Sequence, residues 1–191
     1  MNILIIDNGS IHLTELQRFL AGHNTTTINK SELNTFGYDS QDLIVLSGSS
    51  SAPIVADHNN YKYEIELIKT SQLPIIGICM GFEVIAWTYG ANLKEMKSEE
   101  IGILNIRITS NETIFNGIKT LRVAENHRWV VDKIKYPLVE LAKSKDGIEI
   151  IRHATKDIYG FQFHPEITKI ENQGQIIFNN LLEQFQNKLK V

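Results

Sequence analysis

The sequence lacks most of the features that would place it at once in a specialised class of protein. It has a single cysteine among 191 residues, so no internal disulfide can form, and no Cys/His cluster has zinc-ligand spacing. Charged residues make up 21% of the chain and nearly cancel, to a formal net charge of −3. That balance favours neither nucleic acid nor an anionic membrane surface as a partner.

Signals for membrane insertion and secretion are missing as well. No apolar run reaches the roughly 18 residues of a membrane span, and the N-terminal MNILIIDNGS has no basic segment of the kind that opens a signal peptide. No motif indicates an organic cofactor. We therefore expect a cytoplasmic protein that uses neither a cofactor nor a metal ion.

What the chain does have is a 42% hydrophobic content, enough for a sizeable core, and an alternation of strand and helix signals. Buried parallel strands are predicted at residues 2–7, 42–53 (which run into a small-residue loop) and 74–79. Helices are predicted at residues 10–22, 59–72 and 81–91. These repeated units predict an α/β fold, an open and mostly parallel twisted sheet of flavodoxin-like type, flanked by helices on both faces.

The middle of the chain changes character. It has few helical signals, and the pattern favours short strands at residues 102–109, 119–126, 138–154 and 158–164, as a smaller mixed or antiparallel part. A final helix is expected over residues 172–189, with an apolar face of Ile177, Phe178, Leu181, Leu182, Phe185 and Leu189. No repeat, low-complexity tract or linker interrupts the pattern, so residues 1–191 are interpreted as a single domain.

The one cysteine, Cys79, stands between two glycines in GICMG, where a predicted strand meets a predicted helix. Ligands of open α/β sheets bind at the carboxyl ends of the strands. Flanking glycines allow the close backbone approach of a sharp, strained turn, as in the G-x-S-x-G elbow of hydrolases. The following helix would direct free N–H groups at the sulfur, which favours thiolate and can stabilise an oxyanion. The motif alone is weak, because a lone cysteine is more often a small core residue.

A thiolate nucleophile works best with a histidine that takes and returns a proton. Of the six histidines, His164 has the most informative context, at the end of the alternating segment YGFQFHPEI. Pro165 ends that strand, and Glu166 is close enough to accept a hydrogen bond from the imidazole and to hold its tautomer. Cys79, His164 and Glu166 are thus candidates for the nucleophile, the base and the orienting group of a catalytic triad.

Taken together, GICMG and FQFHPE resemble the motifs of the class I, triad-type glutamine amidotransferase family. The order Cys…His-x-Glu matches, as do the domain size, the N-terminal strand ILIIDNG and the strand VLSG ahead of the cysteine. The resemblance covers nearly the whole chain. The opening IDNGS and the stretch IFNGIKTLRV…NH look most like the free-standing glutaminase subunits of GMP synthase.

The resemblance implies a glutaminase. Cys79 would attack the side-chain amide of L-glutamine, His164 would protonate the departing ammonia and then activate water, and Glu166 would orient His164. By matching position, the Met80 N–H and an N–H of the Gly48–Ser49 stretch would form the oxyanion hole. The chain has no synthetase domain, so a separate synthetase subunit is expected to accept the ammonia.

Two positions depart from the family pattern. Glu83 stands where the motif G-x-C-x-G-x-Q usually ends in glutamine, and an ionised glutamate can only accept hydrogen bonds. It could pair with a substrate's α-ammonium group or repel its α-carboxylate, and the ending GFE resembles γ-glutamyl hydrolases. Ser49 and Ser50 replace glycine and proline of a common Ser-Gly-Gly-Pro loop, and serine adopts positive φ less freely than glycine.

A third informative stretch is VAENHRWVVDKI, residues 123–134. By resemblance it is a histidine-bearing loop between strands, similar to the His-basic-Trp sequence of γ-glutamyl hydrolases. His127 is therefore a candidate for contact with substrate or with a partner. The competing interpretation is an exposed turn with Trp129 packed on the surface.

Three functions are compatible with these observations. The first is an ammonia-producing subunit that serves a separate synthetase, of the GMP synthase type. The second is a self-sufficient hydrolase of γ-glutamyl amides, which Glu83 and the NHRW sequence favour. The third is a non-catalytic binding module of the same fold, and the intact set of Cys79, His164 and Glu166 argues against it.

Overall fold

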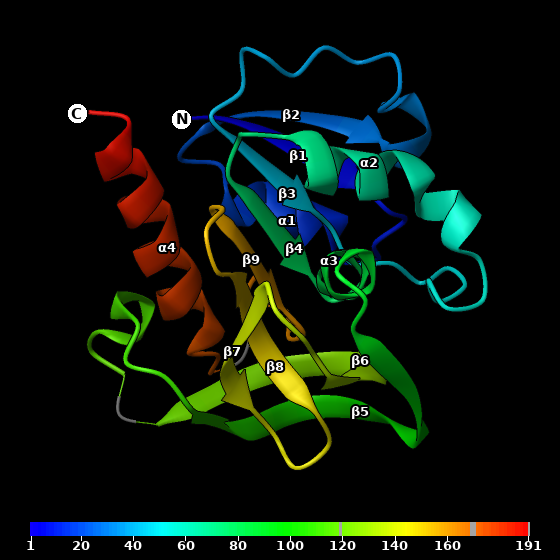
Figure 1. Ribbon diagram of the computed structural model, residues 1–191. Helices are drawn as coiled ribbons and strands as arrows, with labels where there is room; N and C mark the ends of the chain where they lie inside the picture. Colours follow the sequence, from blue (N-terminus) through cyan, green and yellow to red (C-terminus); the bar gives the residue numbers. More distant parts are fainter. Residues whose placement is uncertain (119, 169–170, 191) are drawn as a thin grey trace.

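The computed structural model describes residues 1–118, 120–168 and 171–190, and within them nine strands form one sheet. The strand order is β2-β1-β3-β4-β9-β8-β6-β5-β7 (Figure 1). The parallel half of the sheet consists of β1 (Asn2–Asp7), β2 (Asn24–Asn29), β3 (Leu43–Leu46), β4 (Ile75–Ile78) and β9 (Ile158–Phe161). Its central strands are nearly continuous aliphatic runs because both of their faces are covered.

The antiparallel half begins at β9, which pairs parallel with β4 on one side and antiparallel with β8 on the other. Its further strands are β5 (Asn92–Ile108), β6 (Leu121–Lys133), β7 (Leu138–Lys143) and β8 (Ile148–His153). The long strands β5 and β6 form a hairpin. Because β7 pairs with both β5 and β8, this part closes on itself as a small barrel.

The predicted α/β class is confirmed, but the sheet is mixed rather than mostly parallel. The reason is the length of the connections in the second half of the chain. Residues 144–147, between β7 and β8, are too few for the crossover that a parallel pair requires. β7 and β8 can therefore only pair antiparallel.

Helices cover both faces of the parallel half. They are α1 (Leu13–Phe19), α2 (Lys62–Thr70), α3 (Met80–Thr88) and α4 (Gly174–Lys188), with short 3-10 turns η1 (Lys30–Glu32), η2 (His58–Tyr61) and η3 (Thr113–Phe115). Alternate strand residues face opposite sides, so Ile3 and Ile5 pack with α1 and α4, while Leu4 and Ile6 pack with α2 and α3. None of the helices in the described ranges has the length and apolar content to cross a membrane.

Three segments differ from the sequence-based prediction. β2, an edge strand, has the sequence NTTTIN with Ile28 as its buried residue, and the sequence analysis does not predict it. Residues 123–134, expected to form a loop or turn, lie almost entirely in the continuous strand β6, because pairing with β5 keeps the backbone extended. Leu189 follows the end of α4 and is 55% exposed, so the apolar face of that helix ends at Phe185.

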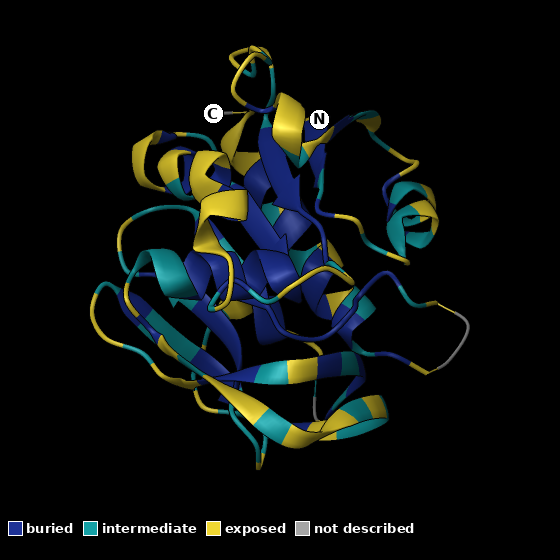
Figure 2. Ribbon diagram, turned by 90° about the vertical axis from the view of Figure 1, so that its right-hand side faces the viewer, coloured by how far each residue is buried: buried dark blue, intermediate teal, exposed yellow. Residues whose placement is uncertain are grey.

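The carboxyl ends of β1, β3 and β4 meet at one edge of the sheet, where buried side chains tie the following loops together. The Asn8 N–H donates to Ser47 Oγ (2.9 Å), and Asn8 Nδ2 donates to the Ser47 carbonyl oxygen (3.0 Å) and to Glu64 Oε1 (3.0 Å). The central strands are buried, while exposed residues lie in the loops, on the outer faces of helices and along β5 (Figure 2). The bonds of Asn8 fix the loop after β3 beside the end of β1.

Candidate active site

Cys79 occupies the sharp turn that the sequence predicts between β4 and α3. With φ of 49° and ψ of −104°, it alone among the non-glycine residues that the structure describes has a positive φ. Strain of this kind costs on the order of 1–3 kcal/mol and collects at functional sites. The Cys79 N–H donates to the Phe161 carbonyl oxygen (2.8 Å), so β9 helps to hold the turn.

The glycines on either side of Cys79 are required by space. A Cβ on Gly77 would lie 2.5 Å from the backbone of Gly81. A Cβ on Gly81 would collide with the carbonyl oxygen of Leu46 and lie 2.7 Å from its Cβ. Helix α3 can approach β3 and β4 this closely only because both positions lack a side chain, which confirms the reason inferred from the sequence.

His164 and Glu166 come together just beyond β9. His164 Nδ1 lies 2.7 Å from Glu166 Oε1, and both side chains are buried. The His164 N–H donates to the Ala124 carbonyl oxygen in β6 (2.8 Å), and Asn172 Nδ2 donates to the His164 carbonyl oxygen (2.8 Å). Nothing in the sequence singles out Asn172, yet it fixes the turn that carries the imidazole.

The pair acts electrostatically on the thiol. Burial lowers the pKa of His164, but the Glu166 carboxylate and Cys79 raise it by more, so that it stands well above its usual value. Burial raises the pKa of the Cys79 thiol, and the hydrogen-bonded His164 lowers it only in part. The helix end alone therefore does not produce the thiolate that the sequence suggested. A thiolate at Cys79 would require transfer of its proton to His164, whose charged form the Glu166 carboxylate favours.

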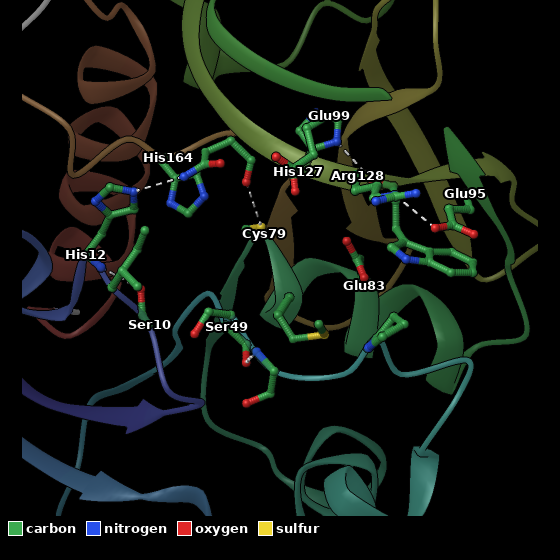
Figure 3. A pocket seen from close by; sticks show the side chains of 17 residues that line it. Ser10, His12, Ser49, Cys79, Glu83, Glu95, Glu99, His127, Arg128 and His164 are labelled. Atoms are coloured by element: carbon green, nitrogen blue, oxygen red, sulfur yellow. Dashed lines mark hydrogen bonds and ion pairs between the residues drawn. The ribbon is translucent and has the colours of Figure 1, made fainter. Parts of the chain in front are cut away.

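These groups open into a pocket of about 440 Å³. In Figure 3, His12 and His164 lie on one side of Cys79, while Glu83 lies on the other. Serines from the loops after β1 and β3 line part of the wall. A thiol, a base and an orienting carboxylate at the edge of a pocket form the arrangement that acyl transfer requires.

Comparison with known proteins gives the family. The family model described as glutamine amidotransferase class-I matches residues 4–184, which is most of the chain. The chain belongs to the class-I glutamine amidotransferase family.

Several relatives within this family match along almost the whole chain. The sequence is 30% identical over 194 residues to one subunit of the glutamine-hydrolyzing GMP synthase of Methanobrevibacter smithii, covering 96% of this chain and 95% of that one. It is 29% identical over 182 residues to the corresponding subunit from Pyrococcus abyssi, covering 93% and 95%. A crystal structure described as a GMP synthase subunit from Thermoplasma acidophilum superposes with a TM-score of 0.87 at 26% identity, covering 100% of this chain and 96% of that one.

The backbone positions that this family resemblance implies for an oxyanion hole lie next to the sulfur. Met80 is the first residue of α3, so its N–H has no acceptor within the helix. Gly48 follows β3, and a Cβ there would lie 3.1 Å from His164 Cε1 and 3.6 Å from Cys79 Cβ. A side chain at this position would therefore crowd the His164 ring, which would have to shift by a few tenths of an ångström.

The serine loop that departs from the family pattern is held by its own side chains. Ser49 lines the pocket, but its hydroxyl donates to the Asn8 carbonyl oxygen (2.7 Å) and accepts from the Ser51 N–H (2.9 Å). The Ser50 N–H donates to the Gly9 carbonyl oxygen (3.2 Å). These bonds anchor the loop to the end of β1, so that proline is not needed to restrict it.

Glu83 projects into the pocket from α3 and is only 3% exposed (Figure 3). Gln162 Nε2 donates to its Oε1 (3.4 Å), while no donor from the described residues reaches its Oε2. Burial raises the pKa of Glu83 to about 7, against smaller opposing effects of Gln162 and His127. Where the family motif usually has glutamine, this chain therefore has a carboxyl group that burial makes harder to ionise.

His127 lies in β6 and is 5% exposed, so the alternative of an exposed turn is wrong. Its Nδ1 lies 3.0 Å from the Trp129 carbonyl oxygen, and its Nε2 lies 3.1 Å from Glu125 Oε2. Trp129 also lines the pocket. His127 thus lines the pocket, with Nδ1 beside a backbone carbonyl and Nε2 beside the Glu125 carboxyl group.

His12 is a part of this pocket that the sequence analysis does not single out. Its ring meets the His164 ring edge to face, at a centroid distance of 4.9 Å and an interplanar angle of 63°. Its Nε2 lies 3.5 Å from Asn126 Nδ2. Burial and the nearby His164 lower the pKa of His12, which favours a neutral ring beside the pair. The signal that could have found it is its place just after the first strand.

Proposed function

We propose that this chain is a glutaminase that hydrolyses L-glutamine to glutamate and ammonia, with Cys79 as nucleophile, His164 as acid and base, and Glu166 as the group that orients His164. The observation that carries the proposal is the 2.7 Å pair of His164 and Glu166 beside a strained Cys79 at the edge of a pocket. Membership of the family supports the choice of glutamine as substrate.

The reaction begins when the Cys79 thiol gives its proton to His164 and the sulfur attacks the amide carbon of glutamine. N–H groups of Met80 and of the Gly48–Ser49 segment stabilise the oxyanion. His164 then protonates the amide nitrogen, ammonia leaves, and a thioester to Cys79 remains. A water molecule loses a proton to His164 and attacks the thioester. Glutamate is released, and the sulfur recovers the proton.

The ammonia passes to a separate synthetase subunit of the GMP synthase type. Relatives at 30% and 29% identity are named as one subunit of that enzyme, which implies a second one. This chain spans 95% of the length of each of those two relatives. The same division of labour between a glutaminase and a synthetase is therefore proposed here.

A self-sufficient hydrolase of γ-glutamyl amides is the second candidate. The observation that favours it is Glu83, a buried carboxyl group in the pocket wall that can pair with a cationic group of a substrate. Such an enzyme would be fully active alone. The third candidate, a non-catalytic binding module, is disfavoured because His164 and Glu166 are assembled beside Cys79 in hydrogen-bonding geometry.

The test is to incubate the purified chain with L-glutamine and with a panel of γ-glutamyl compounds, and to measure glutamate and ammonia. The same assay is repeated after addition of a GMP synthetase and its substrates, and Cys79→Ala is the control. Weak glutaminase activity that rises with the synthetase supports the main proposal. Strong turnover of a γ-glutamyl compound without a partner supports the alternative. Activity that survives in Cys79→Ala excludes both.

A further inference from the structure

Next to the pocket lies a group of buried acidic and imidazole side chains that the proposed reaction does not use. Glu125 and His127 are in β6 and Glu149 is in β8, and the three residues are 2%, 5% and 0% exposed. One potential ligand atom from each side chain lies within 4.8 Å of the other two. His127 also lines the pocket, which connects the group to solvent.

Several polar atoms of this group lack a hydrogen-bond partner among the described residues. A carbonyl oxygen can only accept, so the bond of His127 Nδ1 to the Trp129 carbonyl (3.0 Å) places the ring proton on Nδ1 and a lone pair on Nε2. Nε2 then faces Glu125 Oε2 at 3.1 Å, and when Glu125 is ionised two acceptor atoms point at each other. Among the residues that the structure describes, none donates to the four carboxylate oxygens of Glu125 and Glu149.

Protons on the carboxyl groups, or a metal cation between them, would satisfy these atoms. In the described ranges no lysine or arginine forms an ion pair with Glu125 or Glu149. A proton on His127 would supply one charge against two carboxylates. Leaving buried carboxylates without partners costs several kcal/mol, so the group must take up either protons or a metal cation.

We propose that Glu125, His127 and Glu149 bind one divalent transition-metal ion, with Zn²⁺ as the ion that suits them best. Imidazole and carboxylate ligands bind Zn²⁺ at about 2.0–2.2 Å, and two atoms at that distance from one ion stand roughly 3–3.5 Å apart. The observed separation of His127 Nε2 and Glu125 Oε2 is 3.1 Å. The bond from Nδ1 to a backbone carbonyl is the contact by which metal-binding histidines are usually oriented.

The ion would also hold the strand beside the nucleophile. Asn126 stands between the two ligands of β6, and its carbonyl oxygen lies 3.9 Å from Cys79 Sγ. Its Nδ2 lies 3.5 Å from His12 Nε2. A metal ion bound to both neighbours of Asn126 would therefore restrict the backbone that contacts the thiol, and its role would be structural.

The test measures metal binding directly, without glutamine. The full chain carries Cys79→Ala in every sample, which removes the thiolate as a competing ligand. After chelator treatment and removal of the chelator, Zn²⁺ is titrated by calorimetry and Co²⁺ by visible absorption. We expect one tightly bound equivalent and a rise in Tm with Zn²⁺. His127→Gln and Glu149→Gln should each weaken Zn²⁺ binding by at least about 10–100-fold. Replacing a residue that only hydrogen-bonds to a metal ligand already causes a loss of that size.

Glu64→Gln is the matched control. Glu64 is also buried and has one oxygen without a hydrogen-bond donor among the described residues, but it lies in α2, where it accepts a hydrogen bond from Asn8. Its Zn²⁺ affinity should equal that of the Cys79→Ala parent. Circular dichroism identifies variants that fail to fold, and Glu125→Gln then replaces them. Absence of binding in the parent overturns the proposal and means that protons bridge the carboxylates. Binding that persists in folded His127→Gln and Glu149→Gln overturns it as well.

Discussion

Glu83→Gln tests how strongly the pocket disfavours a charged carboxyl group. The side chain is 3% exposed, and burial raises its pKa from 4.5 to about 7. A carboxyl group whose pKa is higher in the folded state keeps its proton longer when folded. It therefore stabilises the fold at low pH, and that contribution is lost as the pH rises through 7. Because a tenfold change in proton affinity is worth about 1.4 kcal/mol, the loss between pH 5 and pH 9 is about 2–3 kcal/mol.

Glutamine is neutral and nearly isosteric, so the variant escapes this loss. Urea unfolding of both proteins at pH 5, 7 and 9, in the presence of a chelator, measures it. The free energy of unfolding of Glu83→Gln minus that of the wild type should increase by about 2–3 kcal/mol from pH 5 to pH 9. His127 and Gln162, which interact with Glu83, are the same in both proteins. Glu66→Gln, at an exposed position of α2, controls for the loss of one charge. A difference that stays constant with pH would refute the reasoning, because Glu83 would then be equally easy to ionise in both states.

Three further substitutions test the geometry of the site. Glu166→Gln should lower kcat for glutamine hydrolysis by at least about 10²-fold with little change in KM, because an amide cannot stabilise the His164 imidazolium; steady-state ammonia release measures this, and an unchanged kcat would contradict it. Gly81→Ala should cost about 1–3 kcal/mol of stability or prevent folding, since its Cβ would collide with the Leu46 carbonyl oxygen, and a thermal melt reports the loss. Asn172→Ala should lower the free energy of unfolding by about 1–3 kcal/mol, because the buried His164 carbonyl oxygen loses its hydrogen-bond donor. An unchanged melting temperature would contradict this role of Asn172.

The parts of the site that the sequence predicts are those determined by neighbouring residues. The turn around Cys79 depends on Gly77 and Gly81, two positions away on either side, and the structure confirms the crowding that requires them. His164 and Glu166 are likewise two residues apart, and their side chains meet at 2.7 Å. Local spacing is enough to predict both features because each joins residues two positions apart, although the crowding at Gly81 comes from Leu46 in β3.

The parts that the sequence does not predict depend on pairing between distant segments. Asn172 contacts His164 from the segment just before α4, and His12 contacts it from the loop after β1. No regular spacing in the sequence connects these residues. Glu125 and Glu149 are brought together only by the closing of β6 and β8 within the antiparallel half. The family resemblance predicts a loop at the stretch that holds His127, whereas the long hairpin with β5 keeps it extended.

The chain contains two buried pairs of imidazole and carboxylate whose chemistry differs although the residue types are the same. In the first, Nδ1 of His164 is bound to Glu166, which leaves the other ring nitrogen free to exchange a proton with Cys79. In the second, Nδ1 of His127 is bound to a backbone carbonyl, and Nε2 lies 3.1 Å from an oxygen of Glu125. The first imidazole can therefore exchange a proton with the thiol. The lone pair on Nε2 of the second imidazole lies beside two buried carboxyl groups, where it is suited to hold the proposed metal ion.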